Sequence, residues 1–121
     1  MEKEREVELN FDLVECNIIL AALDVLIGMN VGTPPLDKMA DAWSRQITHT
    51  DKVQKIILTI TEALVIYDTF KMFYRKILTI NAFLGIIHKY DLQLWESTTE
   101  AELRDAAENF QLSELLKSAG I

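Results

Sequence analysis

The sequence predicts an all-α protein, a four-helix bundle-like domain built around one long central helix. Two observations lead to this fold class. The stretch Lys52–Tyr90 contains no proline and one glycine, and its apolar residues recur in steps of three and four. Two amphipathic stretches precede it and one follows it. A chain of 121 residues is long enough for one hydrophobic core, so residues 1–121 are expected to form a single helical domain.

The N-terminal part predicts a charged lead-in and two helices. Residues 1–8 are mostly charged and are expected to fray. Asn10 is a suitable N-cap for a first helix that ends near Gly28. Threonine and two prolines at 33–35 open the second helix, because proline is tolerated in a first turn. Trp43 in that helix is expected to be a core or interface anchor.

The central stretch is expected to begin at a cap, Thr50 or Asp51, and to run as one helix or as a helix with one kink. As a helix it would be about 60 Å long. A kink is expected at Gly85 or in the aromatic segment Phe70–Tyr74. Its β-branched residues leave strands as an alternative. Charged residues interrupt every apolar run, which argues against a membrane span.

The C-terminal part predicts the last helix. Ser97 with Glu100 and Thr99 with Glu102 both have the spacing of a capping box, so the helix begins at one or the other. Ser113 is placed to cap a separate final turn, and Gly120 followed by Ile121 fits a helix ending.

One part of the chain resembles a known family. The run ECNIILAAL at 15–23 is followed by prolines and by a second helix that ends near Arg45 and Gln46. Over residues 7–47 this pattern resembles a helical hairpin of small uncharacterised phage proteins, with a longer turn in this chain. The resemblance implies no known activity. It implies a phage accessory protein, a class that includes inhibitors of host defence or transcription.

The charge is concentrated at the two ends of the chain. The net charge is −7, and residues 1–15 and 96–121 each hold six acidic and two basic residues. This balance argues against nucleic acid as a partner, since phosphate contacts need a basic surface. The acidic residues are expected to form either ordinary solvated faces or a surface for a basic partner. The acidic surface predicted on the last helix consists of Glu100, Glu102, Asp105 and Glu108.

No residue pattern predicts catalysis, metal binding or a cofactor. The two histidines, His49 and His88, lack a partner at metal-ligand spacing, and the spacing of Glu102 and Asp105 lacks its companion carboxylates. Cys16 is the single cysteine, so no intrachain disulfide is possible, and it is expected in the core. The N-terminus lacks the apolar segment of a signal peptide. We therefore expect a cytoplasmic protein, in the host cytoplasm if it is viral.

The predicted partner or oligomer interface combines aromatic and basic side chains. Aromatic residues and arginine are enriched at the centres of protein interfaces. If the long helix overhangs its neighbours, a second copy would cover this segment; otherwise the last helix does. The interface residues are Phe70, Phe73, Tyr74, Arg75, Lys76 and Trp43.

These observations favour a non-enzymatic protein-binding module that acts as a homodimer and regulates or inhibits a host protein complex. The alternatives are a small helical enzyme or ligand-binding bundle, and a structural oligomeric subunit.

Overall fold

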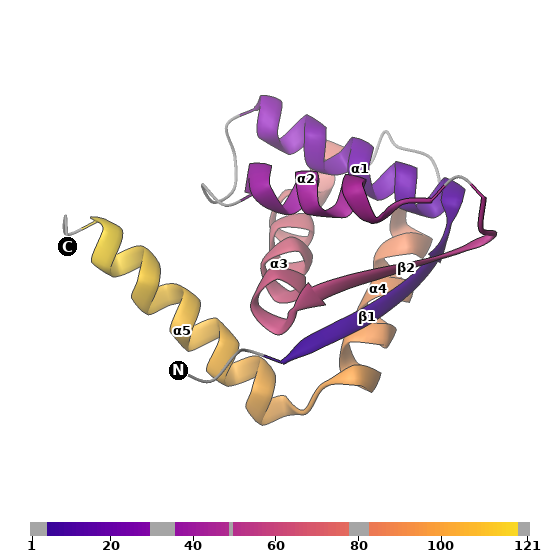
Figure 1. The fold of residues 1–121 in the computed structure, drawn as a ribbon. Helices are drawn as coiled ribbons and strands as arrows, with labels where there is room; N and C mark the ends of the chain where they lie inside the picture. Colours follow the sequence, from indigo (N-terminus) through magenta and orange to yellow (C-terminus); the bar gives the residue numbers. More distant parts are fainter. Residues whose placement is uncertain (1–4, 30–35, 49, 78–82, 119–121) are drawn as a thin grey trace.

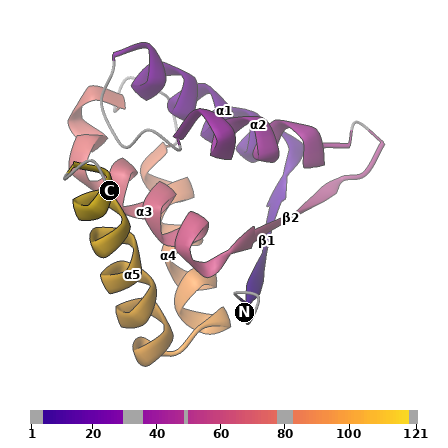
Figure 2. The same cartoon turned by 60° about the vertical axis from the view of Figure 1, so that its left-hand side comes forward.

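The protein is an α+β domain in which a two-stranded ribbon is wrapped by helices (Figures 1 and 2). The computed structural model describes residues 5–29, 36–48, 50–77 and 83–118. The elements in chain order are β1 (Glu6–Asp12), α1 (Leu13–Gly28), α2 (Leu36–Gln46), β2 (Val53–Thr59), α3 (Ile60–Ile77), α4 (Phe83–Ser97) and α5 (Glu100–Ser118). α1 and α2 lie side by side at one end of the molecule, and α5 packs along α3 (Figure 2).

The prediction of an all-α bundle is wrong, because two segments form strands. β1 and β2 pair antiparallel, with Glu6 opposite Thr59 and Asp12 opposite Val53. Along β1, Val7, Leu9 and Phe11 are buried between exposed or half-buried polar neighbours. This is the period of two that a strand with one buried face requires. The predicted charged lead-in at 1–8 therefore includes the start of a core strand.

The predicted central helix over 52–90 is wrong for the same reason. Its first part is β2, where Gln54, Ile56 and Leu58 are buried and the residues between them are exposed. α3 begins only at Ile60, and α4 is a separate helix that begins at Phe83. The backbone of α3 is non-helical at Phe73, with φ −113° and ψ 18°, so the kink falls within the segment Phe70–Tyr74 where it was predicted.

Three helices begin with the same capping arrangement. Asp12, rather than the predicted Asn10, caps α1: its carboxylate accepts from the Glu15 backbone N–H at 2.7 Å, and the Glu15 side chain accepts from the Asp12 N–H at 2.9 Å. Thr59 and Glu62 form the same pair at the start of α3, which corrects the predicted start at Thr50 or Asp51.

The third capping box starts α5. The Thr99 hydroxyl accepts from the Glu102 backbone N–H at 3.2 Å, and Glu102 accepts from the Thr99 N–H at 3.0 Å. This confirms one of the two predicted starts. α5 then runs unbroken to Ser118, so the predicted separate turn at Ser113 is wrong. The predicted helix opening at 33–35, His49 and the predicted ending at 120–121 lie outside the described residues.

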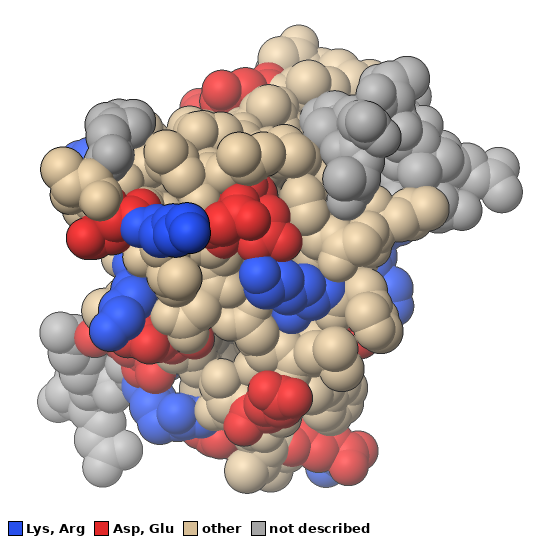
Figure 3. Space-filling model, turned by 90° about the vertical axis from the view of Figure 1, so that its right-hand side faces the viewer, with Lys and Arg blue, Asp and Glu red and all other residues tan. Residues whose placement is uncertain are grey.

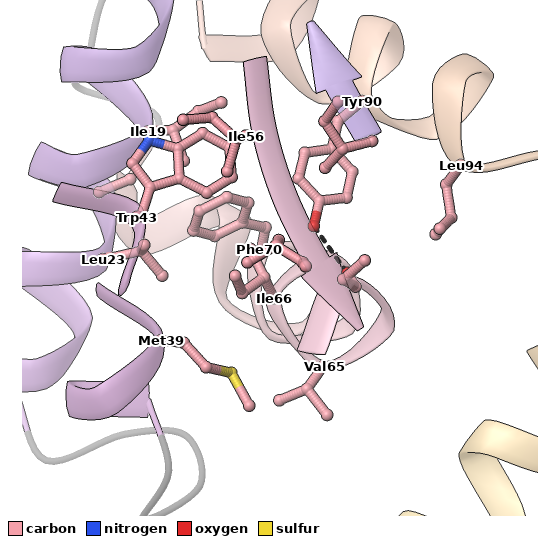
Figure 4. Close-up of a cluster of buried hydrophobic side chains, with 14 of the residues drawn as sticks. Ile19, Leu23, Met39, Trp43, Ile56, Val65, Ile66, Phe70, Tyr90 and Leu94 are labelled. Carbon is pink, nitrogen blue, oxygen red and sulfur yellow. Dashed lines mark hydrogen bonds between the residues drawn. The ribbon is translucent and has the colours of Figure 1, made fainter. Parts of the chain in front are cut away.

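The core lies between the inner face of the ribbon and the helices. Side chains from α1, α2, β2, α3 and α4 point into one interior (Figure 4). Phe11 of β1 connects two parts of it, with its ring centroid 6.0 Å from that of Trp43 and 6.1 Å from that of Tyr90. The polar atoms of the two large buried aromatic side chains are hydrogen-bonded: Trp43 Nε1 donates to the Cys16 carbonyl at 3.2 Å, and the Tyr90 hydroxyl donates to the Ala63 carbonyl at 2.7 Å.

Two glutamine side chains cover part of the outer edges of the ribbon. Gln93 of α4 accepts from the Asn10 N–H at 2.6 Å and donates to the Asn10 carbonyl at 2.9 Å, on β1. Gln46 of α2 accepts from the Ile57 N–H at 2.7 Å and donates to the Ile57 carbonyl at 2.9 Å, on β2. Each amide thus takes the place of one peptide group of a neighbouring strand. A two-stranded ribbon has only edge strands, and these contacts satisfy backbone groups that its own ladder leaves unpaired.

Candidate interaction surface

The residues predicted to form an interface do not gather on one described surface. Trp43 and Phe70 are 0% and 1% exposed, and both point into the core (Figure 4). Phe70 packs edge-on against Phe83 of α4, with centroids 5.1 Å apart. Phe73 is half-buried against the core, and the side chains of residues 74–76 lie outside the described part of the chain. In this fold, neither Trp43 nor Phe70 presents its side chain to a partner.

The acidic residues of α5 differ in their surroundings. Glu100, Asp105 and Glu108 are exposed, and Glu100 forms an ion pair with Arg104 one turn away at 3.3 Å. Glu102 is half-buried and accepts from Arg5 at 2.6 and 2.9 Å, while Arg5 also donates to the Ser97 carbonyl at 2.7 Å. The hydrogen bond from Arg5 and the cap at Thr99 lower the pKa of Glu102 to about 2. Glu102 therefore joins the start of α5 to the start of β1.

Of the cysteine and histidine side chains that the structure describes, one is buried and the other is exposed. Cys16 is fully buried, and burial, with the nearby charge of Asp12 and Glu15, raises the pKa of its thiol to about 11. His88 is exposed on α4. Within the described ranges, no three His, Cys, Asp or Glu side chains come together as a metal site.

Polar side chains meet between α3 and α4. Burial, followed by the Asp91 carboxylate beside it, raises the pKa of Tyr67 to about 12. The Tyr67 ring stacks on Tyr90 at 6.0 Å and lies 5.4 Å from Lys71 Nζ. Burial also raises the pKa of Asp68. Tyr67 is thus packed between the ring of Tyr90 and the Lys71 ammonium group.

The outer face of α4 carries an apolar stripe that the sequence analysis did not identify. Leu84, Leu92 and Trp95 are 61%, 48% and 53% exposed. Together with His88 they follow one another in steps of four, four and three, so they share one side of the helix over about 17 Å. The buried residues Phe83, Ile86, Tyr90 and Leu94 occupy the opposite side. Among the aromatic side chains that the structure describes, only Trp95 is exposed.

The α4 stripe continues onto the ribbon. Leu92 and the exposed Val53 line one depression of about 420 Å³, together with Phe11 and a polar rim that includes Lys89 and Glu96. Lys89 is held in place by Glu15 at 2.7 Å and lies 5.4 Å from the centroid of Phe11. On the face shown in Figure 3, charges of both signs are interspersed among uncharged side chains. An apolar centre with a mixed polar rim is the usual composition of a protein-binding surface.

A second depression lies along the outer edge of β2. It has a volume of about 510 Å³ and is lined by Gln46, Thr48 and residues 51–55. A third, of about 540 Å³, lies beside it between the start of α1 and residues 50–52. All three depressions surround the end of the ribbon at which Asp12 pairs with Val53.

Comparison of the chain with models of protein families, with curated proteins and with solved structures found no match. Among the described residues, no helix combines the length and the apolar composition that crossing a bilayer requires.

Proposed function

We propose that this protein is a non-enzymatic protein-binding module whose contact surface is the outer face of α4. The observation that carries the proposal is the exposed Trp95, which lies on the same side of α4 as Leu84 and Leu92. Leu92 in turn lines the depression that also contains the exposed Val53 of the ribbon. Tryptophan is strongly enriched among the residues that dominate binding energy, because it offers a large rigid area at low entropic cost. The surface replaces the segment at 70–76 as the proposed interface.

The groups that could serve chemistry have structural tasks, which supports a non-enzymatic role. The Cys16 thiol is buried and its pKa is raised, and Glu102 caps α5 and binds Arg5. The net charge of −7 disfavours a nucleic-acid partner. The more specific hypothesis, a phage accessory protein that regulates or inhibits a host complex, rests on the resemblance of residues 7–47 alone.

The experiment is a comparison of partner capture by matched variants. The double variant Leu92→Ser, Trp95→Ser removes two apolar side chains from the stripe, and Val25→Ser removes an exposed apolar side chain from α1 as the control. We expect a partner captured by the wild-type protein to be lost with the double variant and kept with the control. Equal capture by all three proteins would refute the α4 surface. Tight co-purification of a small molecule in place of a protein would favour a ligand-binding bundle.

The sequence also predicts a homodimer, and the same face of α4 is the surface we propose for it. Light scattering over a concentration series measures this directly. A wild-type dimer that becomes a monomer with Trp95→Ser would assign the stripe to self-association. A wild-type monomer at all concentrations would leave the surface to a different protein and would rule out the dimer.

A further inference from the structure

Some backbone hydrogen-bonding groups of β2, beside the 510 Å³ depression, have no partner among the described residues. In an antiparallel ribbon, alternate residues direct both N–H and C=O away from the partner strand. Ile57 is such a residue, because both of its groups bind Gln46. Val53 and Lys55 lie four and two residues before it and therefore have the same orientation. Within the described part of the chain, no group binds the outward N–H and C=O of Val53 or Lys55.

The side chains at this edge favour a segment that carries negative charge. Lys52 and Lys55 line the depression, and neither forms an ion pair within the described residues. The third charged lining residue, Asp51, accepts a hydrogen bond from Thr48 at 3.2 Å. The opposite edge of the ribbon also has backbone groups that no described residue binds, but its exposed side chains there are the carboxylates of Glu6 and Glu8. An acidic strand is thus attracted to the β2 edge and repelled by the β1 edge.

We propose that the edge of β2 at Val53–Lys55 binds an acidic, extended segment of a protein partner as a third strand. This inference deepens the proposed function, on which it rests, by naming the chemistry of the segment that the partner inserts. Main-chain hydrogen bonds to Val53 and Lys55 hold the segment, and its carboxylates pair with Lys52 and Lys55. The Gln46 side chain already occupies the next position at Ile57, so it limits the length of the added strand.

A second copy of this chain is the less suitable occupant. Pairing the same edge with itself places Lys52 and Lys55 of one copy near those of the other, and like charges across a strand pair are destabilising. Exposed lysines on an edge strand are a common means of preventing such pairing. The attraction that these lysines offer is instead to carboxylates.

The test uses a heptapeptide of alternating aspartate and valine with blocked ends, titrated into the ¹⁵N-labelled full chain. We expect the amide signals of Val53 and Lys55 to shift and their hydrogen exchange to slow. A peptide with lysine in place of aspartate should bind about tenfold or more weakly. The peptide can be N-methylated at its odd or at its even positions. Only one of these two sets of N–H groups faces the β2 edge, so methylation of that set should abolish binding and methylation of the other should not.

Two sets of variants make the test specific. Lys55→Pro removes an outward N–H without removing a ladder hydrogen bond, and Glu8→Pro makes the matched change on the β1 edge. We expect Lys55→Pro to lose binding and Glu8→Pro to keep it. Lys52→Glu with Lys55→Glu leaves the backbone intact and should also lose binding, which covers the case in which a proline variant does not fold.

Three results would overturn the inference: no binding of the acidic peptide at millimolar concentration, equal binding of both N-methylated sets, or a dimer whose contact is this edge. Leu92→Ser with Trp95→Ser should not change peptide binding. If the peptide fails to bind while capture still depends on Trp95, the edge inference fails and the proposed function stands. If the peptide binds and capture does not depend on Trp95, the assignment to α4 fails.

Discussion

Gln93 is the residue at which the contribution of the ribbon edges to stability can be measured. Its amide makes two hydrogen bonds to Asn10, at 2.6 and 2.9 Å, in a partly buried position. A hydrogen bond contributes about 1 kcal/mol, and a buried group left without a partner costs more. Gln93→Leu, which keeps most of the volume, should therefore lower the free energy of unfolding by about 2–3 kcal/mol. For a chain of this length that is about 8–12 °C in Tm.

The assay is thermal and urea unfolding followed by circular dichroism, with two comparison variants. Gln93→Glu keeps an acceptor for the Asn10 N–H but cannot donate to the Asn10 carbonyl. At neutral pH its free energy of unfolding should therefore lie between those of the wild type and Gln93→Leu, or equal that of Gln93→Leu. Gln46→Leu removes the equivalent pair at Ile57, where the bonds are exposed, and should cost about 1 kcal/mol. A Gln93→Leu protein within about 0.5 kcal/mol of the wild type would refute the reasoning, because that is the range of ordinary surface substitutions.

Four further predictions concern three side chains. Glu102 has a folded-state pKa of about 2, against an ordinary value of 4.5, so its stabilising effect is present above pH 4.5 and is lost as the pH falls towards 2. In urea unfolding at a series of pH values, Glu102→Gln should therefore reduce the loss of stability in acid. An unchanged dependence of the free energy of unfolding on pH would contradict the pairing with Arg5. The Cys16 thiol, with a pKa of about 11, should react slowly with a disulfide reagent at pH 8 in the folded protein and rapidly in urea, and equal rates would show that it is accessible. Because the unfolded thiol ionises near pH 9.0, Cys16 should also contribute to a loss of stability between pH 9 and 11 that is absent in Cys16→Ala. Tyr90→Phe removes the buried bond to Ala63 and should cost about 1 kcal/mol in urea unfolding, whereas a stabilised variant would argue against that bond.

The sequence predicted those features that depend on neighbours in the chain. Thr99 and Glu102 are three residues apart, and their capping box is confirmed. The kink at Phe73 lies in one of the two places predicted for it, whereas the other, Gly85, lies within α4. At the start of α1 the prediction was wrong by two residues, since Asp12 and not Asn10 forms the cap. Such contacts involve a few consecutive residues, so their spacing is visible in the sequence.

The strands were missed because their pairing partners are far apart. Glu6 pairs with Thr59 across two intervening helices, and nothing in either local pattern specifies the other. The apolar residues of 52–60 fit a helix better than a strand, since Val53, Ile56, Ile57 and Ile60 follow the helical spacing. The strand alternation is weaker in the sequence, because one of its buried positions is the polar Gln54. The alternation in β1 was hidden because its exposed positions are so strongly charged that they read as a solvated tail.

The missed strands also explain why Trp43 lies in the core and not at an interface. Trp43 is buried because Phe11, on the strand that was missed, packs against it at 6.0 Å. Once Trp43, Tyr90 and Phe11 fill the interior, the opposite side of α4 receives no cover from any described element, and Trp95 is exposed there. Whether a tryptophan in an amphipathic helix lies in the core or on the surface depends on which elements pack against that helix, and these are not visible in the sequence. The same ribbon that closes the core also supplies the open backbone of Val53 and Lys55. The missed strands therefore determine which side chains are buried and which backbone groups of the described residues stay exposed. For this reason we place the two proposed contact surfaces on the outer face of α4 and on the edge of β2, and not at residues 70–76.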